Sequence, residues 1–214
     1  MAKILTAGRW FLQVISALEA SNIDCQSLCL KVGIEYSKLK EVDGRIDIDL
    51  AFDFWQALSE QCQDEQIGLK LAKNIDVAGF KALGFSLLTS DTVKEAIERL
   101  VRYQKIMGDA GLLTLERHSH HYSLVVDLRG NRRVAPHQPI DATFTSLLNI
   151  IGLILKKAII PQKVYLKRTA PNDATAYEMA FHCLPEFSQP RNEILFSINT
   201  LEASLPNADP SLAR

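Results

Sequence analysis

Three histidines close together are the residues whose type and spacing first suggest a metal site. His118, His120 and His121 lie between two short apolar runs, and an imidazole nitrogen is a common ligand of zinc and other transition metals. Neighbouring side chains on a strand point to opposite faces, however, and a metal needs ligands that converge. Glu116 is the one acidic residue beside them. We therefore expect a solvated hairpin turn here, without a metal.

Three arginines that follow shortly afterwards could bind an anion. Arg129, Arg132 and Arg133 form a basic run around Gly130 and Asn131. A guanidinium group can hold a carboxylate through two parallel hydrogen bonds, so this run could contact a carboxylate ligand. Runs of like charge are more often solvated surface, and that is the interpretation we favour.

No stretch of the sequence carries a catalytic motif. It has no G-x-S-x-G, no H-E-x-x-H and no glycine-rich phosphate loop followed by Lys and Ser or Thr. The stretch "GFKALGF" has two glycines, but no strand pattern precedes it. We therefore expect a protein that is not an enzyme and needs no cofactor.

The stretch "CLKVGIEYSKLKEV" resembles a helix-turn-helix and offers a second function. Gly33 would lie in the turn, and Lys38 and Lys40 would lie on the second helix. Glu35 and Glu41 cancel both charges, and that helix has no Arg, Asn or Gln to read bases. Packing within a larger domain is the favoured interpretation, and direct DNA binding stays an alternative.

Composition excludes some classes of partner and compartment. The chain has 214 residues, 47% of them hydrophobic and 23% charged, with a formal net charge of −1. It therefore lacks the basic excess that binding to a phosphate backbone requires. Its four cysteines are scattered without a C-x-x-C spacing: Cys25, Cys29, Cys62 and Cys183. Such thiols are typical of a reduced, cytoplasmic protein.

The apolar segments do not indicate a membrane. The N-terminal stretch "MAKILTAGRWFLQVISALEA" has no long apolar core followed by a small-residue cleavage site. The most apolar stretch, "ATFTSLLNIIGLILKKAIIP", is interrupted by Thr143, Thr145, Ser146 and Asn149. We expect a buried core helix there rather than a membrane span.

Apolar residues at helical spacing occupy the first half of the chain. They predict helices over residues 10–18, 24–32, 35–42, 49–62, 64–73, 79–90 and 92–107. Asp24 and Gly33 suit the two ends of the second helix, and Ser90-Asp91 suit the start of the last. On that last helix, Glu95 and Arg99 are spaced to form an ion pair, as are Glu98 and Arg102.

The second half has strand signals around one long helix. The runs "LLTLER" and "YSLVVDL" predict a hairpin in which Tyr122, Leu124 and Val126 share a face. A helix over 139–157, a strand over 163–168, a helix over 173–181 and a strand over 192–197 follow. The predicted fold class is α+β, a helical N-terminal half packed on a small antiparallel sheet with a long buried helix.

Two segments carry a resemblance to a known family. The stretch from Ile67 to Met107 has a glycine-containing apolar helix, a Ser-x-Thr-x-x-x-Ala start at Ser90 and an Arg-Tyr pair. The stretch from Val164 onward has Pro171, Tyr177, Phe187, Asn192, Phe196 and a Leu-Pro-x-Ala-x-Pro-x-Leu tail. Together they resemble the sensor domain of AraC-family transcription regulators, of the arabinose-binding-domain type. The chain departs from the family at His182, where relatives often have glycine after phenylalanine.

The resemblance implies a function and a domain organisation. Residues 1–203 would be a ligand-sensing domain, and residues 204–214 would begin a linker to a C-terminal helix-turn-helix domain that this sequence lacks. Ser204-Leu205-Pro206 read as a chain leaving structure, and Asp209-Pro210 as a new helix start. The sensor would form a homodimer, with Trp10 and Phe11 as candidate contacts, and DNA would be bound only through the missing domain. A stand-alone small-molecule-binding protein is the further alternative.

Ligand contacts are expected between the hairpin face and the neighbouring helices. The candidates are apolar or aromatic residues with a few polar tips: Phe85, Leu88, Arg102, Tyr103, Tyr122, Leu124, Tyr165 and Lys167. With few neutral hydrogen-bonding side chains on offer, these residues favour a small organic acid over a sugar. A close-packed core at the same place is the competing interpretation. The effector, the target promoters, the dimer interface and the choice between activation and repression are left open by the sequence.

Overall fold

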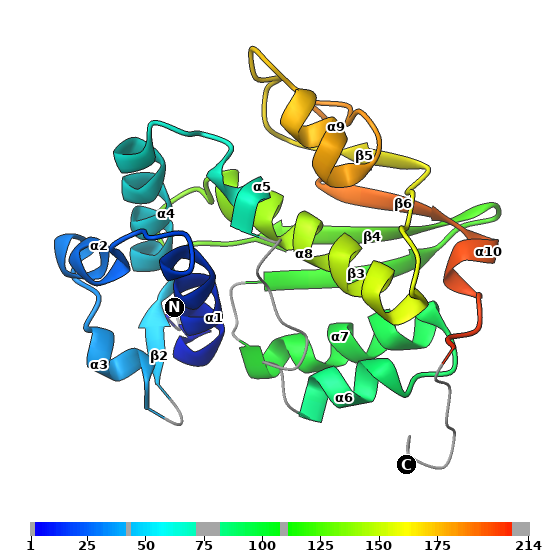
Figure 1. Ribbon diagram of the computed structural model, residues 1–214, viewed down its shortest axis with the longest axis horizontal. Helices are drawn as coiled ribbons and strands as arrows, with labels where there is room; N and C mark the ends of the chain where they lie inside the picture. Colours follow the sequence, from blue (N-terminus) through cyan, green and yellow to red (C-terminus); the bar gives the residue numbers. More distant parts are fainter. Residues whose placement is uncertain (1–2, 42–43, 72–81, 108–110, 207–214) are drawn as a thin grey trace. The chain divides into compact units, whose positions relative to one another are not determined.

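The computed structural model has an α+β fold that divides into two compact units. It describes residues 3–41, 44–71, 82–107 and 111–206. Unit 1 comprises Met1–Ile75, Gln104–Gly111 and Leu128–Thr143. Unit 2 comprises Asp76–Tyr103, Leu112–Asp127 and Phe144–Arg214. Helices α7 and α8 each contribute residues to both units (Figure 1).

Unit 1 contains the N-terminal helices and a short two-stranded ladder. Its elements are β1 (Leu5–Ala7), α1 (Gly8–Glu19), α2 (Cys25–Val32), α3 (Tyr36–Leu39), β2 (Arg45–Asp47), α4 (Ile48–Cys62) and α5 (Ile67–Leu71). The helices confirm the expected order. The antiparallel β1–β2 pair is an addition that periodicity did not predict, because strands of three residues are too short to show alternation.

The predicted ends of α2 are confirmed. The Asp24 side chain accepts a hydrogen bond of 3.0 Å from the Ser27 backbone N–H, as an N-cap does. Gly33 ends the helix with φ +81°, a left-handed conformation that glycine adopts without strain. The next helix, α3, is a single turn of four residues.

The core of unit 1 includes a residue that was expected at a dimer contact. Phe11 is 3% exposed, and its ring meets the Phe54 ring edge-to-face with 5.0 Å between the centroids. The expectation of an exposed Phe11 was therefore wrong, because its place on the apolar face of α1 directs it inward. The Trp10 side chain lies outside the described part of the structure.

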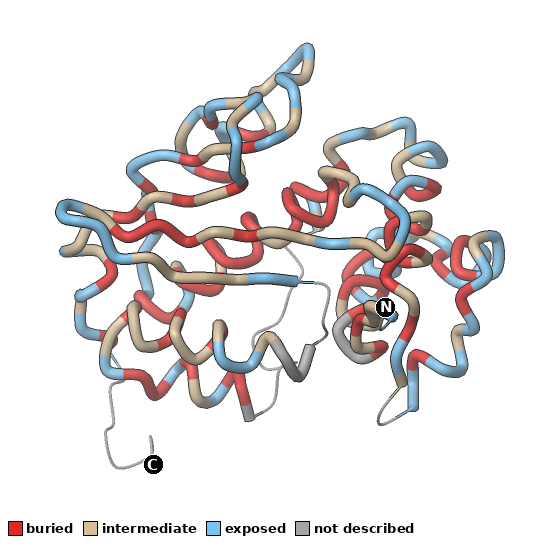
Figure 2. The backbone as a smooth tube through the Cα atoms, turned by 180° about the vertical axis from the view of Figure 1, so that it is seen from behind, coloured by how far each residue is buried: buried red, intermediate tan, exposed pale blue. Residues whose placement is uncertain are grey.

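Unit 2 is built on a four-stranded antiparallel sheet in the order β3-β4-β6-β5. Its elements, with the two shared helices, are α6 (Ala82–Leu88), α7 (Val93–Met107), β3 (Gly111–Arg117), β4 (His121–Leu128), α8 (Gln138–Leu155), β5 (Lys163–Tyr165), α9 (Thr175–Phe181), β6 (Glu193–Ser197) and α10 (Ile198–Leu201). The hairpin and the final strand–helix–strand order confirm the prediction. Buried residues alternate with half-buried ones along β6, as expected for a strand with one core face (Figure 2).

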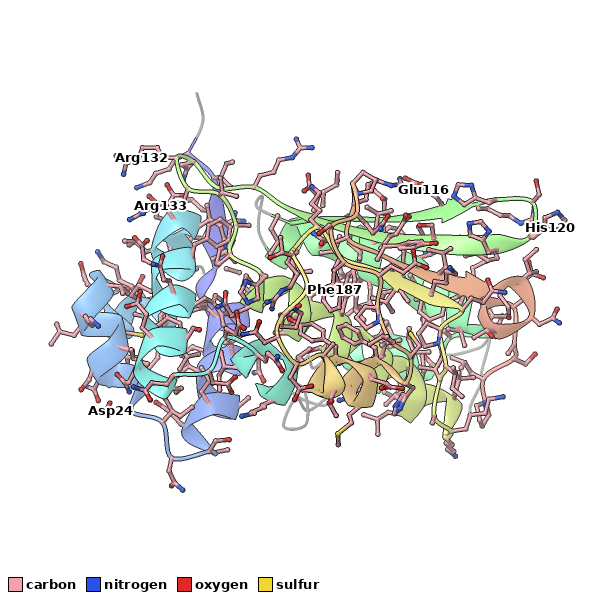
Figure 3. All side chains as sticks on the ribbon, turned by 90° about the horizontal axis from the view of Figure 1, so that it is seen from above. Asp24, Glu116, His120, Arg132, Arg133 and Phe187 are labelled. Carbon is pink, nitrogen blue, oxygen red and sulfur yellow. The ribbon has the colours of Figure 1, made fainter. Side chains whose placement is uncertain are left out.

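Helix α8 is the expected long buried helix. Among the described residues, α8 is the one helix whose length and composition would allow it to cross a membrane. However, 78% of that apolar window is buried inside the structure, which is the burial of a core helix. Figures 1 and 3 show its later turns beside the sheet of unit 2.

Two expectations about α7 need correction, its N-terminal cap and one of its two ion pairs. Thr92, not Ser90-Asp91, caps α7, because its hydroxyl accepts a 3.2 Å hydrogen bond from the Glu95 N–H. Glu95 and Arg99 form the predicted ion pair at 2.8 Å. Glu98 pairs with Lys94 at 3.2 Å rather than with Arg102.

Helix α6, which lies within the helix predicted over residues 79–90, is only partly buried although its sequence is mostly apolar. Its described part begins at Ala82, and residues 79–81 lie outside the described chain. Leu87 is fully buried, whereas Phe85 on the same helix is 55% exposed. The helix therefore has one core face and one solvent face, as the spacing of its apolar residues permits.

The chain does not leave the structure at Ser204. Ser204 forms an isolated antiparallel bridge with Thr92, and Leu205 is buried. The expected departure was wrong at these two positions, because the Leu205 side chain is buried and its N–H donates to the distant Asp91 carbonyl at 2.9 Å. The expected helix start at Asp209-Pro210 lies outside the described residues.

Candidate functional site

The arginine run belongs to a loop that binds a carboxylate of the protein itself. The carboxylate of Asp49, near the start of α4, is 5% exposed. It accepts backbone hydrogen bonds from Asn131 at 2.9 Å, Arg132 at 3.0 Å and Arg133 at 3.4 Å. The anion-binding amides of the loop are therefore already occupied by Asp49.

Two residues of the same loop, Gly130 and Asn131, make further close contacts. A Cβ at position 130 would lie 2.3 Å from the Arg133 carbonyl oxygen and 2.7 Å from Asp49 Oδ1, so no larger residue fits. The Asn131 side chain accepts from the Ile4 N–H at 2.7 Å and donates to the Ile4 carbonyl at 3.0 Å. The loop thus clamps the N-terminal strand to α4.

The arginine side chains of this loop point outward or pair locally. The Arg132 side chain is 88% exposed, and Arg133 lies 3.1 Å from Asp53 (Figure 3). These contacts agree with the favoured interpretation of a solvated basic turn. The structural role of the loop, which the sequence did not suggest, comes from its backbone N–H groups and from Asn131.

The helix-turn-helix-like segment lacks a helix able to read DNA. Its second helix, α3, has only four residues, and Leu39 on it is fully buried. Lys38 pairs with Glu35 at 2.8 Å, and the Lys40 ammonium lies 4.9 Å from the centroid of the Tyr36 ring. A recognition helix must present several side chains to a groove, and one turn cannot do so.

The histidines form the end of the β3–β4 hairpin. The His118 and His121 rings stack with 4.6 Å between centroids, and His120 lies at the tip (Figure 3). Glu116 lies 3.7 Å from His118 and also binds Arg191 at 3.0 Å. Within the described residues, no group of three or more His, Cys, Asp or Glu side chains could hold a metal ion.

Of the predicted ligand contacts, Tyr122 and Leu124 lie on the core face of the sheet. They pair directly with Phe196 and Ile194 on β6, and Tyr122 is 2% exposed. The Tyr122 hydroxyl accepts from Arg117 Nε at 3.2 Å and donates to Glu202 Oε1 at 3.0 Å. Both hydrogen-bonding roles of this hydroxyl are therefore filled within unit 2.

Tyr165 and Lys167 lie on the side of the sheet opposite Tyr122. Tyr165 pairs directly with Glu193, whose neighbour Ile194 points to the core face. Directly paired residues share a face and successive residues alternate, so Tyr165 faces away from the core. The Lys167 ammonium is engaged with Asp127 at 3.3 Å. The structure therefore does not bring these two residues together with Tyr122 and Leu124.

The other four predicted contacts are exposed on two connected helices. Phe85 and Leu88 on α6 are 55% and 36% exposed. Arg102 and Tyr103 on α7 are exposed as well. We use the name α6–α7 face for this set of four exposed residues, two on α6 and two on α7. They combine two apolar side chains, a phenol and a guanidinium, which is a chemistry that suits an apolar body with an acidic group.

A polar cluster, of which the sequence analysis predicted only the Glu95–Arg99 pair, joins the two helices. Arg99 donates to the Ser86 carbonyl at the end of α6 and to the Glu95 carboxylate. The Glu95 carboxylate also accepts a 2.7 Å hydrogen bond from the Asp91 N–H, and this bond, with Arg99, lowers the pKa of Glu95. The Thr-x-x-Glu spacing of Thr92 and Glu95 is the sequence signal that could have indicated this capping arrangement.

Comparison with known proteins links this chain to transcription regulators. The ornithine utilization regulator of Pseudomonas aeruginosa is 23% identical over 158 residues, which are 70% of this chain and 44% of that protein. The crystal structure of the transcriptional regulator CdpR from Pseudomonas aeruginosa has the same fold, with a TM-score of 0.64 at 15% identity. That match covers 88% of this chain and 58% of the CdpR chain. The chain thus spans about half the length of these relatives.

A family model described as the arabinose-binding domain of AraC transcription regulators, N-terminal, matches residues 23–205. The match runs from the start of α2 to the docked segment after α10, and so includes the whole sheet and the α6–α7 face. This agrees with the resemblance found in the sequence. The chain belongs to the family of N-terminal arabinose-binding domains of AraC transcription regulators.

Proposed function

We propose that this chain is the effector-binding part of an AraC-type transcription regulator, and that effector binding controls DNA binding by a separate C-terminal domain. The observation that carries the proposal is the family match over residues 23–205. The greater length of both regulators leaves room in such proteins for a second domain. The net charge of −1 and the four-residue α3 support a division of labour in which this part does not read DNA.

The α6–α7 face is the proposed place of effector contact. Its exposed apolar residues, Phe85 and Leu88, would cover the body of the effector, and Arg102 would bind a carboxylate. A charge-assisted hydrogen bond of this kind contributes about 1.5–3 kcal/mol. An organic acid is therefore the proposed effector class. Tyr122 and Leu124 would support the sheet rather than touch the effector, since both are closed off in the core.

The same proposal implies a compartment, an oligomeric state and a mode of action. A regulator of this kind acts in the cytoplasm, where it meets both its effector and DNA. It would act as a homodimer on paired half-sites. It would carry out no chemistry on its effector, because binding alone shifts the balance between two arrangements of the protein.

A thermal-stability panel tests the proposal. The probes are benzoate and hexanoate as organic acids, L-ornithine because one relative regulates ornithine utilization, and L-arabinose because of the family description. A ligand at 100 times its Kd stabilises a protein by about 2.7 kcal/mol. For a chain of this size, that raises Tm by about 5–10 °C.

We expect an organic acid to raise Tm in the wild type but much less in Arg102→Ala. Arg132→Ala is the matched control, because it removes an exposed arginine from the loop of unit 1. A shift given only by L-arabinose, or a shift unchanged in Arg102→Ala, would contradict the proposed effector class and site. No shift with any of the four probes would count against effector binding by this domain.

A further inference from the structure

The last described segment of unit 2 is a docked strap rather than a loose tail. It comprises α10 and residues 202–205, and we call it the strap. Leu201 and Leu205 are buried, so the strap has one apolar anchor in its middle and another at its C-terminal end. Ser197 caps α10 by accepting a 3.0 Å hydrogen bond from the Thr200 N–H.

The strap binds the N-terminal end of α7 through its backbone. The Leu205 N–H donates to the Asp91 carbonyl at 2.9 Å, and the Val93 N–H donates to the Ala203 carbonyl at 3.3 Å. Thr92 and Ser204 form the antiparallel bridge between these two hydrogen bonds. The strap therefore pairs with Asp91, Thr92 and Val93, which lead into α7, as a short strand would.

A side-chain contact also ties the strap to the sheet. Glu202 accepts a 3.0 Å hydrogen bond from the Tyr122 hydroxyl, and the Tyr122 ring is buried on the core face of β4. Replacing Tyr122 with phenylalanine would remove this contact and keep the ring. The strap is thus held from two directions, by α7 and by the sheet.

The start of α7 is in turn part of the polar cluster that joins α6 and α7. Thr92, which bridges to the strap, also caps α7 through Glu95. Glu95 binds Arg99, and Arg99 binds the Ser86 carbonyl on α6. A continuous set of hydrogen bonds and backbone pairing therefore connects Ser204 with the helix that carries Phe85 and Leu88.

We infer that the strap is the output contact of this domain, and that the strength of its docking on α7 reports the state of the α6–α7 face. The inference rests on the proposed function, because it assigns a regulatory route to the same face. Linkage requires the coupling to be reciprocal: whatever loosens α6 and α7 must loosen the strap, and whatever loosens the strap must affect α6 and α7.

Amide hydrogen exchange tests the coupling without any effector. In the Arg99→Gln variant we expect the Leu205 amide to exchange about tenfold faster, although position 99 does not touch the strap in any described contact. In the reciprocal variants, Tyr122→Phe and Leu205→Ala, we expect faster exchange at Val93 and at the Thr89 and Ser90 amides that end α6. Lys163→Ala, which removes an exposed ion pair on β5, is the control and should change none of them.

A redox-controlled lock tests the link to effector binding. Directly bridged residues in an antiparallel pair are close enough for a disulfide, so Thr92→Cys combined with Ser204→Cys can fix the strap when oxidised. Reduction of the same protein provides the matched control. We expect the affinity for benzoate or hexanoate to differ by about fivefold or more between the two forms.

The outcomes separate the two proposals. If an organic acid stabilises the domain but neither its affinity nor α6–α7 exchange responds to the strap, the strap is only packing and this inference is overturned. If no probe binds but exchange at Leu205 and at α6 remains reciprocally coupled, the strap inference holds and the proposed effector class is wrong. Unchanged exchange at Leu205 in Arg99→Gln overturns the inference on its own.

Discussion

Arg99 of α7 donates one N–H to the Ser86 carbonyl at the C-terminal end of α6, which joins the two helices through a single guanidinium group. A second N–H binds the Glu95 carboxylate at 2.8 Å. The Ser86 carbonyl also accepts a 2.9 Å hydrogen bond from Ser90 Oγ, and a cation at a helix C-terminus interacts favourably with the helix dipole. The relationship explains how an exposed face on α6 can keep a fixed position relative to α7.

Removing this guanidinium should destabilise unit 2. Arg99→Ala leaves the Ser86 carbonyl and the Glu95 carboxylate without their shared donor in a largely buried place. We expect the free energy of unfolding to fall by about 1–3 kcal/mol. Urea denaturation checks this, with Arg132→Ala, an exposed arginine, expected to change it by less than about 0.5 kcal/mol. Equal effects of the two substitutions would contradict the role assigned to Arg99.

The carboxylate of Asp49 should be essential to the loop of unit 1. Asp49→Ala removes the acceptor of three backbone hydrogen bonds and leaves those N–H groups around an empty place. We expect a loss of about 3 kcal/mol in the free energy of unfolding. Asp53→Ala, which removes a surface partner of Arg133, should cost less than about 1 kcal/mol. A small effect at Asp49 would show that the loop is not held by its carboxylate.

His182 should be replaceable by glycine with a gain in stability. It ends α9 with φ +58°, in the left-handed region that is costly for a residue with a Cβ. Glycine avoids that cost but loses more backbone entropy on folding, so we expect a net gain of about 0.5–1 kcal/mol. His120→Gly at the hairpin tip is the control and should give no gain. The gain can be read from Tm, and a loss at position 182 would contradict the prediction.

The two cysteines of α2 should be slow to react in the folded protein. Burial raises the pKa of Cys25 to about 12 and that of Cys29 to about 11, so both are neutral thiols at pH 8. Because burial also raises the pKa of Cys183, mass spectrometry after iodoacetamide treatment should find the half-buried Cys62 modified first, and all four cysteines modified once the protein is unfolded. Early modification of Cys25 would contradict its burial.

The same pKa shifts predict how stability depends on alkaline pH. An unfolded thiol ionises near its ordinary pKa of 9.0, whereas the folded Cys25 and Cys29 thiols stay neutral to higher pH. The stabilisation is therefore fully present below pH 9 and is lost as the pH rises from about 9 toward 12. Urea denaturation of Cys25→Ala at pH 8 and pH 10.5 should show a smaller decrease between the two pH values than the wild type. An identical decrease would contradict the linkage.

The sequence predicted some local features of the fold correctly, although it missed the Thr92 cap of α7 and the Lys94–Glu98 pair. Asp24 and Gly33 were correctly placed at the ends of α2, because capping depends on residues within one turn. The resemblance indicated that relatives often have glycine where this chain has His182. The structure supplies the physical reason, because the backbone at this position is left-handed. These are features in which a residue and its partners are neighbours in the chain.

Long-range pairing was the part that the sequence could not supply. Tyr165 was grouped with Tyr122, but the register of β5 on β6 places it on the opposite face. Ser204 and Leu205 were expected to leave the structure, because the partner of Leu205, Asp91, lies more than a hundred residues earlier. Of the candidate site, the chemical types at Phe85 and Arg102 could be named in advance, but their exposure on α6 and α7 required the structure.

The central claim is that an organic acid binds at the α6–α7 face, and a titration followed by NMR tests it most directly. Benzoate and hexanoate would be added to isotope-labelled protein while the backbone amide signals are recorded. We expect saturable shifts at Phe85, Leu88, Arg102 and Tyr103, followed by Leu205 in the strap. Saturable shifts confined to residues 129–133, or no shifts with either acid, would contradict it.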